Sequence, residues 1–469
     1  MTSDSPDPDP FALRTFPLRG GRAVEVLRDG MRAPGAASLG GSGLIPWSEI
    51  THLAPGRRHL RIGTTRGVRL LPRAEFVHPA DAHELVREIV SRIAASPEGR
   101  LQLARMAAIE ERWRHPAAVR ATPALAVICV LVFGLQLAFH PLLEEVAAFG
   151  ATLARVEPWR YVTGNLLHAT WPILHLPLNL LAIFAFGLLV ERALGAAATA
   201  FVMIVSGVAA MAGAALAGLE GVVGASGIAM GLVGAMLWLE YRHADALPAA
   251  WRVPRRIFVG LLVAENLLFL FVPWVATSGH LGGLAGGALA AALVSAPLLR
   301  RPVAPRWLVA ANALLGVAVV ASVSAAAFEL AGGETGILPR RGERLLGLDH
   351  APAELLNDTA WMIALSPSPT PPALDVALRL AERAAGESGR SNANILDTLA
   401  EVLFRLGKPA EAVETIDEAI RLEPGESYFR EQRRRFTGER DFDDRPAPPG
   451  LPLRPPAAPF ESEPPGVPI

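Results

Sequence analysis

The sequence predicts an α-helical protein that crosses the membrane several times and carries a soluble domain at each end. Two observations lead to this class. The chain of 469 residues is 51% apolar and 19% charged, which is more apolar than an ordinary soluble protein. Its apolar residues also gather in stretches of about 20 residues, the length of helix that crosses a hydrocarbon core. We therefore expect a helical membrane core between a small N-terminal α+β domain and a C-terminal all-α module.

The charge balance and the cysteine content argue against other classes. A formal net charge of −1 argues against a nucleic-acid partner, because neutralising phosphates needs a surplus of Lys and Arg. Cys129 is the single cysteine, so no disulfide can form within the chain. The first residues, MTSDSPDPDPFAL, lack the basic and apolar regions of a signal peptide, and we expect them in the cytoplasm.

Residues 1–114 are predicted to form a cytoplasmic domain and a linker. The pattern predicts strands at 60–62 and 67–71 and a helix over 81–93. Several strands followed by one helix resemble a small PH-like domain. Its arginines fit either a solvated sheet face or a contact with anionic lipid; they are Arg57, Arg58, Arg61, Arg66, Arg69 and Arg73.

Seven apolar stretches are predicted to span the membrane. They lie at 123–143, 167–190, 197–218, 222–241, 256–275, 279–299 and 307–328. The first six spans are predicted to form a membrane core over residues 115–300, and residues 301–330 contain the seventh span. Arginine-rich loops stay on the cytoplasmic side. Those arginines are Arg112, Arg114, Arg120, Arg192, Arg242, Arg252, Arg255, Arg256, Arg300, Arg301 and Arg306. The N-terminus is therefore expected inside, and helix counting puts the C-terminus outside.

Residues 331–439 are predicted to form a soluble helical module. The spacing of apolar and small residues over 392–424 fits a tetratricopeptide repeat of about 34 residues, and 357–384 resembles a degenerate partner. Two repeats fall short of the three that usually make a stable array. The module is therefore expected to lean on flanking helices, on a second copy or on a protein partner. The Pro-rich tail, 440–469, is predicted to be disordered.

Ser226 lies among glycines in GVVGASGIAM, residues 221–230, and such a serine either packs helices or acts as a nucleophile. It lies about 24 Å along a helix from Arg242, near the outer end of span four. His280 lies about 30 Å from Arg300 in span six, which runs in the same direction. We therefore expect both side chains in the outer leaflet at similar depth.

Small residues predict that spans four and six pack closely, because small-xxx-small stripes let helix backbones meet. The stripes are Gly227, Gly231 and Ala235 in span four, and Gly279, Gly283 and Gly287 in span six. Packing on these stripes would let Ser226 and His280 form a hydrogen bond. A serine hydroxyl needs such a base to become a good nucleophile.

Span two adds His168, His175 and Asn179. His175 and Asn179 are four residues apart, so they share one helix face and direct polar groups into the bundle. Hydrogen-bond donors near a serine and a histidine suit a developing oxyanion. The rival interpretation is a metal site made of three histidines, but no carboxylate or fourth ligand lies near them, so no metal is expected.

These residues together resemble the rhomboid family of intramembrane serine proteases, over about residues 119–300. The matching residues are Trp159 and Arg160 for a W-R pair, His175 and Asn179 for H-x-x-x-N, and Glu191 and Gly195 for E-x-x-x-G. G-x-S-G-x-x-x-G is matched by Gly224, Ser226, Gly227 and Gly231, and H-x-G-G-x-x-x-G by His280, Gly282, Gly283 and Gly287.

The resemblance implies that Ser226 is the nucleophile and His280 the general base, in a dyad without an acidic member. It implies an oxyanion hole made of His175, the Asn179 side chain and the Ser226 backbone N–H, and no cofactor. The implied substrates are single-span membrane proteins whose helices can unwind in the lipid bilayer. The implied location is the bacterial cell (inner) membrane.

The chain departs from the family pattern in three respects. More residues separate His168 from His175 than in the family, and Met230 stands where the family usually has an aromatic residue. The seventh span and both soluble ends are additions. Two other classes remain open: an inactive rhomboid-like escort for membrane proteins, and a transporter. For the transporter, Glu265 and Asn266 are the unexplained polar residues, and we interpret them as hydrogen bonding within the bundle.

Overall fold

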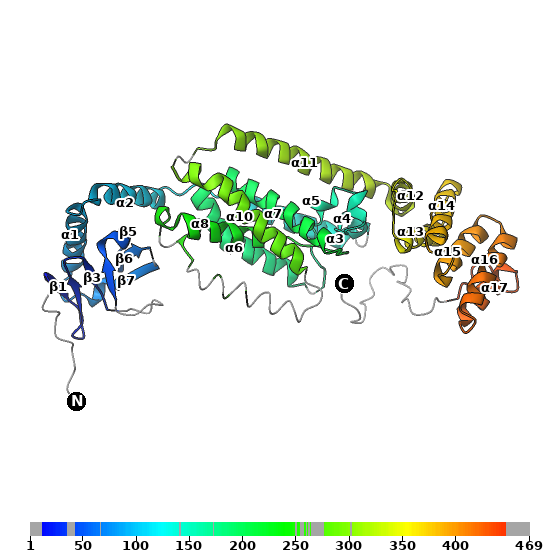
Figure 1. The fold of residues 1–469 in the computed structure, drawn as a ribbon, viewed down its shortest axis with the longest axis horizontal. Coiled ribbons are helices and arrows are strands. Elements are labelled where there is room, and N and C mark those ends of the chain that lie inside the picture. Colours follow the sequence, from blue (N-terminus) through cyan, green and yellow to red (C-terminus); the bar gives the residue numbers. More distant parts are fainter. Residues whose placement is uncertain are drawn as a thin grey trace, which may run out of the picture. The chain divides into compact units, whose positions relative to one another are not determined.

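The computed structural model describes residues 12–34, 43–65, 67–139, 142–171, 173–248, 251–253, 258, 260, 263, 276–300 and 303–446. The chain divides into two compact units. The first contains Met1–Leu131, His168–Ala214 and Gly224–Val317, and the second contains Val132–Leu167, Ala215–Val223 and Ala318–Ile469. Figure 1 labels their elements along the chain.

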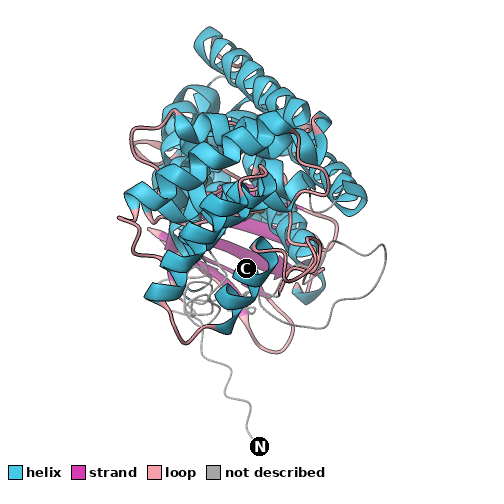
Figure 2. Ribbon diagram, turned by 90° about the vertical axis from the view of Figure 1, so that its right-hand side faces the viewer, coloured by secondary structure: helices cyan, strands magenta, loops and turns pink. Residues whose placement is uncertain are grey.

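The N-terminal part of the first unit holds two antiparallel sheets. One has the order β1 (Arg14–Pro17), β2 (Ala23–Val26), β3 (Gly30–Arg32) and β4 (Leu44–Pro46). The other has the order β5 (Ile50–Pro55), β6 (His59–Thr64) and β7 (Gly67–Pro72). The strands predicted at 60–62 and 67–71 are confirmed as β6 and β7, which pair Leu60 with Leu71. Figure 2 shows the strands together in one part of the molecule.

Two helices follow these sheets. α1 (Asp81–Ala94) confirms the predicted helix and buries Leu85, Ile89 and Ile93 completely, so its apolar stripe completes the core of this domain. α2 (Gly99–Arg114) is an addition that periodicity does not predict, because it buries little besides Met106 and Ile109. The assignment of this domain as PH-like stays a prediction.

Five helices among the described residues are long and apolar enough to cross a membrane. They are α3 (Ala121–Phe139), α6 (His175–Leu194), α7 (Ala196–Leu216), α10 (Thr277–Arg300) and α11 (Arg306–Ala331). Predicted span four is the 17-residue α8 (Ser226–Arg242), which is buried continuously over 227–236 and packs on α10 and α6. Predicted span five, 256–275, lies largely outside the described residues, as do Glu265 and Asn266. The count of seven spans therefore stays a prediction.

The predicted start of the second span, at residue 167, is wrong. α6 begins at His175, and His168 lies in the irregular segment before it. Pro177 gives the physical reason, because a proline without an N–H is tolerated in the first turn of a helix and disrupts the interior. A start at His175 puts Pro177 in that first turn. His175 and Asn179 are both in the helix and remain four residues apart.

The second unit combines the segment between the first two membrane helices with the C-terminal helices. We call residues 142–167 the first-loop segment; it contains α4 (Leu142–Ala147) and α5 (Arg160–Thr163). The C-terminal helices are α12 (Gly333–Leu346), α13 (Ala353–Leu365), α14 (Pro371–Glu387), α15 (Ala393–Arg405), α16 (Pro409–Leu422) and α17 (Ser427–Phe436).

The C-terminal helices pack as consecutive pairs. The predicted repeat at 392–424 coincides with α15 and α16, which are in mutual contact, and the predicted partner at 357–384 coincides with α13 and α14. Asn392 caps α15 by accepting hydrogen bonds from the N–H groups of Asn394 and Ile395. The helical hairpins are confirmed, while their assignment as tetratricopeptide repeats stays a prediction.

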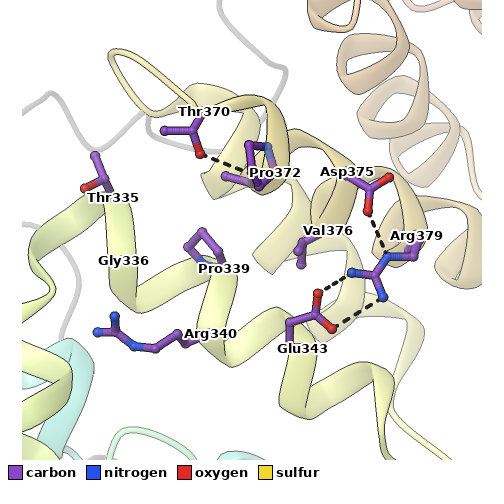
Figure 3. A pocket seen from close by; sticks show the side chains of 11 residues that line it. Thr335, Gly336, Pro339, Arg340, Glu343, Thr370, Pro372, Asp375, Val376 and Arg379 are labelled. Carbon is purple, nitrogen blue, oxygen red and sulfur yellow. Dashed lines mark hydrogen bonds and ion pairs between the residues drawn. The ribbon is translucent and has the colours of Figure 1, made fainter.

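Helices α12 and α14 border a shallow cavity of about 390 Å³ (Figure 3). At one end of it Arg379 of α14 forms ion pairs with Glu343 of α12 and with Asp375 of its own helix. All three side chains are exposed, so these pairs contribute little to stability.

Candidate active site

Ser226 is the first residue of α8. Gly224 precedes it with a φ of +124°, a conformation that favours glycine, and Ala225 takes the N-cap position. The first N–H groups of a helix have no acceptor within the helix. The turn at Gly224 therefore presents the hydroxyl and the backbone N–H of Ser226 together at the start of α8.

His280 lies in the first turn of α10, and its Nε2 is 2.7 Å from Ser226 Oγ. This distance is that of a good hydrogen bond. His280 is 6% exposed, so the imidazole contacts the serine inside the protein. The geometry brings together two side chains that are 54 positions apart in the sequence.

Glycines allow the two helices to approach this closely. A Cβ atom added to Gly283 would overlap the carbonyl oxygen of Gly227, and one added to Gly287 would overlap that of Gly231. A Cβ atom on Gly231 would in turn lie 3.0 Å from the carbonyl oxygen of Gly283. Four of the residues predicted to pair thus face one another, and the backbones of α8 and α10 are in direct contact there, whereas a Cβ atom added to Gly279 would lie nearest Ala210 of α7.

His175, the first residue of α6, faces the same turn. A Cβ atom added to Gly224 would lie 3.0 Å from His175 Nε2 and 3.8 Å from Ser226 Oγ, so these two groups border the same small space. His175 Nδ1 accepts a hydrogen bond of 3.0 Å from the N–H of Ala169. A neutral imidazole carries one proton, so this bond assigns the proton to Nε2. His175 therefore directs a donor toward the space beside Ser226.

Asn179 lies one helical turn after His175 and is buried. Its Nδ2 donates to the carbonyl oxygen of His175 at 2.8 Å. An amide nitrogen carries two hydrogens, so one N–H remains for another acceptor. The Asn179 Oδ1 is also buried and has no hydrogen-bond partner among the residues that the structure describes.

His168 is fully buried, and its Nε2 lies 3.5 Å from the backbone nitrogen of Ala225. Its ring centroid is 5.5 Å from that of His175. His168 therefore contacts the backbone just before Ser226. Within the described part of the chain, no group of three or more His, Cys, Asp or Glu side chains is arranged to hold a metal ion.

Arg160 organises the first-loop segment from within. Its guanidinium donates to the carbonyl oxygens of Ala148 and Glu145 and to the carboxylate of Glu157. Trp159 Nε1 donates to the carbonyl oxygen of Val146 at 3.0 Å. The W-R pair thus supplies donors to backbone carbonyls that neither a helix nor a sheet would satisfy.

Glu157 is a buried carboxylate that sequence reasoning missed. It is 1% exposed, and its carboxylate accepts from three guanidinium groups: those of Arg160, Arg341 and Arg344. Burial raises the pKa of Glu157, but these positive charges and hydrogen bonds outweigh burial, so the net shift is downward and the carboxylate is ionised at neutral pH. The available signal was an acidic residue three positions before Arg160; its partners on α12 could not be read from spacing.

Glu191 caps a membrane helix. Its carboxylate accepts from the backbone N–H groups of Arg120, Ala121 and Thr122, which begin α3. These groups have no acceptor within their own helix, and Glu191 is fully buried. Gly195 follows with a φ of +83° and ends α6, so the E-x-x-x-G residues fix one helix start and one helix end.

The arrangement suits acyl transfer. A serine hydroxyl lies in hydrogen-bond contact with an imidazole, which can take its proton. The Nε2–H of His175 and the first backbone N–H groups of α8, which have no acceptor within their own helix, are donors beside that hydroxyl, where an oxyanion would develop.

Residues 155–297 match the family model described as the rhomboid domain. The chain is 33% identical over 137 residues to RHOMBOID-like protein 6, mitochondrial, of Arabidopsis thaliana, covering 28% of this chain and 42% of that protein. It is 32% identical over 159 residues to Rhomboid protease GluP of Bacillus subtilis (strain 168), covering 33% of this chain and 30% of that protein. The matches thus span less than half the length of these curated relatives.

The fold and the site define a helical membrane protein with a serine and a histidine in contact at the start of two glycine-packed helices. The match to the rhomboid domain and the similarity to the two relatives identify a narrower class than the fold and the site do. The chain carries a rhomboid domain, and these similarities support its placement in the rhomboid family.

Gly224→Ala is expected to lower the rate at which a fluorophosphonate probe labels Ser226 by at least ~10-fold, because the new Cβ atom would press on His175. Gly218→Ala is the matched control: Gly218 also has a positive φ, of +67°, but a Cβ atom added there would meet no more distant residue of the described chain within 4 Å. Labelling rates in detergent measure the effect. Equal rates for the two variants would contradict the proximity of Gly224, His175 and Ser226.

Proposed function

We propose that this chain is an intramembrane serine endopeptidase that cleaves peptide bonds in or near the transmembrane helices of other membrane proteins. The observation that carries the proposal is the 2.7 Å contact between His280 Nε2 and Ser226 Oγ inside a rhomboid domain. The name of the Bacillus subtilis relative, a rhomboid protease, supports the same activity.

In the proposed reaction, Ser226 Oγ attacks the carbonyl carbon of the scissile bond while its proton passes to His280 Nε2. The negative oxygen of the tetrahedral intermediate accepts hydrogen bonds from His175 Nε2–H, from the side chain of Asn179 and from the Ser226 N–H. The C–N bond then breaks as His280 gives the proton to the departing amine. Water, activated by His280, hydrolyses the acyl-enzyme and restores the serine.

The proposed substrates are single-span membrane proteins. Every backbone group of a helix in lipid is bonded within that helix, so an intact helix hides its peptide bonds. A substrate whose helix unwinds readily would expose one of them to Ser226. The donors around Ser226 suit the carbonyl oxygen of a peptide bond that has been exposed in this way.

We propose that the chain is a multi-pass membrane protein with its N-terminus in the cytoplasm and its C-terminal helices outside, in a bacterial inner membrane. The arginine-rich loops support this orientation. The name of the Arabidopsis thaliana relative includes a mitochondrial location. The N-terminal sheets would serve as a PH-like domain, and the C-terminal hairpins as a tetratricopeptide-like module that binds a protein partner or recruits substrate.

Cysteine labelling tests the orientation. In a Cys129→Ala background, a cysteine placed at the exposed Glu382 is expected to react with a membrane-impermeant maleimide in intact cells. A cysteine at the exposed Arg57 is expected to react only after permeabilisation. Protection of position 382 in intact cells would mean that the number of spans is even.

Ser226→Ala and His280→Ala are each expected to reduce cleavage of a model single-span substrate by at least ~10³-fold, because each removes one half of the reacting pair. The purified full chain in detergent, with products identified by mass, provides the measurement. Ser295→Ala is the matched control, since it removes another buried serine, located in α10 and bonded to Trp238.

Cleavage by both dyad variants at the wild-type rate would rule out the dyad. No cleavage by the wild type of any of several unstable model helices, with those helices still bound, would favour the inactive escort instead.

A further inference from the structure

Helix α12 contributes two arginines to the buried carboxylate of Glu157. Arg341 Nε lies 3.2 Å, and Arg344 Nη2 lies 2.6 Å, from Glu157 Oε1, while Arg160 occupies Oε2. Arg341 is 2% exposed and Glu157 is 1% exposed. A buried carboxylate that loses its donors is costly, so this contact is unlike the exposed ion pairs elsewhere on α12.

The same two arginines contact other parts of the first-loop segment. Arg341 also pairs with the Glu145 carboxylate and donates to the Glu145 carbonyl oxygen at 2.8 Å. The guanidinium of Arg344 lies 5.3 Å from the centre of the Trp159 ring, a cation–π contact. α12 thus contacts the W-R pair and its acidic neighbour at several points.

Those contacts complete a set of bonds to consecutive backbone carbonyls. The oxygens of residues 145–148 all accept from side chains, namely those of Arg160 and Arg341 on Glu145, Trp159 on Val146, Thr163 on Ala147 and Arg160 on Ala148. These are the last carbonyls of α4 and the one after it, and carbonyls at a helix end that are satisfied by side chains depend on those side chains staying in place. Arg341 and Glu157, which orients Arg160, are therefore part of what fixes this backbone.

The fixed stretch is bonded to the loop that leads to Ser226. Phe149 exchanges two backbone hydrogen bonds with Val222, of 3.0 and 2.8 Å, and Ala151 donates to the Leu219 oxygen at 2.9 Å. The Glu220 carboxylate accepts from the backbone N–H and the hydroxyl of Thr152. Val222 is four residues before Ser226, and the chain runs directly from it into the turn at Gly224.

We propose that α12 is a positioning element for the proposed protease: Arg341 and Arg344 hold the first-loop segment through Glu157, and its ladder with residues 219–222 fixes the loop that presents Ser226. The catalytic consequence rests on the proposed function. The structural statement that α12 orders residues 145–152 and 219–222 does not depend on the proposed function. The C-terminal helices are thereby assigned a role inside the molecule, in addition to any partner that they bind.

The test compares the wild-type full chain in detergent with Arg341→Met/Arg344→Met. Hydrogen exchange by mass spectrometry is followed in peptides that cover 145–152 and 217–223, and kcat and KM are measured on a model substrate. We expect exchange in both peptides to rise at least ~10-fold, because the buried carboxylate loses two donors. We expect kcat to fall by a similar factor while KM changes little, since the substrate's remote contacts are retained.

Arg379→Met is the matched control. It removes an arginine that pairs with Glu343 of α12, next to Arg344, but only at the exposed edge (Figure 3). Arg341→Lys/Arg344→Lys is a milder variant in case the methionine variant does not fold. It keeps both charges without the forked geometry, so intermediate exchange and intermediate kcat are expected.

Exchange that stays at the wild-type or Arg379→Met level in both peptides would overturn the proposal. Increased exchange with an unchanged kcat would also overturn it, because α12 would then order the loop without positioning Ser226. If the wild type cleaves nothing, the proposed function fails, and the exchange data alone decide whether α12 holds the loop.

Discussion

The close contact of α8 and α10 is the constraint on which the rest of the site depends. Ser226 is the first residue of α8 and His280 lies in the first turn of α10, so the separation of the two side chains is set by the distance between the two helix backbones. That distance is small because Gly227 and Gly231 face Gly283 and Gly287 with no side chain between them. In lipid there is no hydrophobic driving force between apolar side chains, so close packing of helix backbones is a principal source of helix association there.

In both units, buried polar groups are held by specific hydrogen-bond partners. Glu191 caps α3, and the Ala169 N–H sets the protonated nitrogen of His175. In the other unit, side chains satisfy the carbonyls of the first-loop segment. An unsatisfied polar group is expensive away from water, so these bonds fix one arrangement of the helix ends and of the loops that join them. A preorganised site follows from that fixed backbone.

The sequence could predict those features that depend on local pattern. Apolar length predicted the five described helices that are long and apolar enough to cross a membrane, and glycine spacing predicted the contact between α8 and α10 that brings Ser226 and His280 together. Three features could not be found in this way. The start of α6 depends on the position at which a helix tolerates Pro177. The tautomer of His175 depends on a hydrogen bond from a backbone N–H. The burial of Glu157 depends on two arginines that lie 184 and 187 positions later in the sequence. The first is a local effect of proline, whereas the other two are decided by contacts that leave no periodic pattern in the sequence.

The dependence of the site on the contact between α8 and α10 is tested most directly by the rate at which a fluorophosphonate labels Ser226 in Gly287→Val, compared with Gly316→Val. The valine side chain at 287 would force α8 and α10 apart, whereas a Cβ atom added at Gly316 on α11 would meet no other described part of the chain within 4 Å. We predict a fall of ~100-fold for Gly287→Val, because displacing a reacting group by about 1 Å can cost that much, and a rate near wild type for Gly316→Val. A folded Gly287→Val that is labelled as fast as the wild type would contradict this dependence.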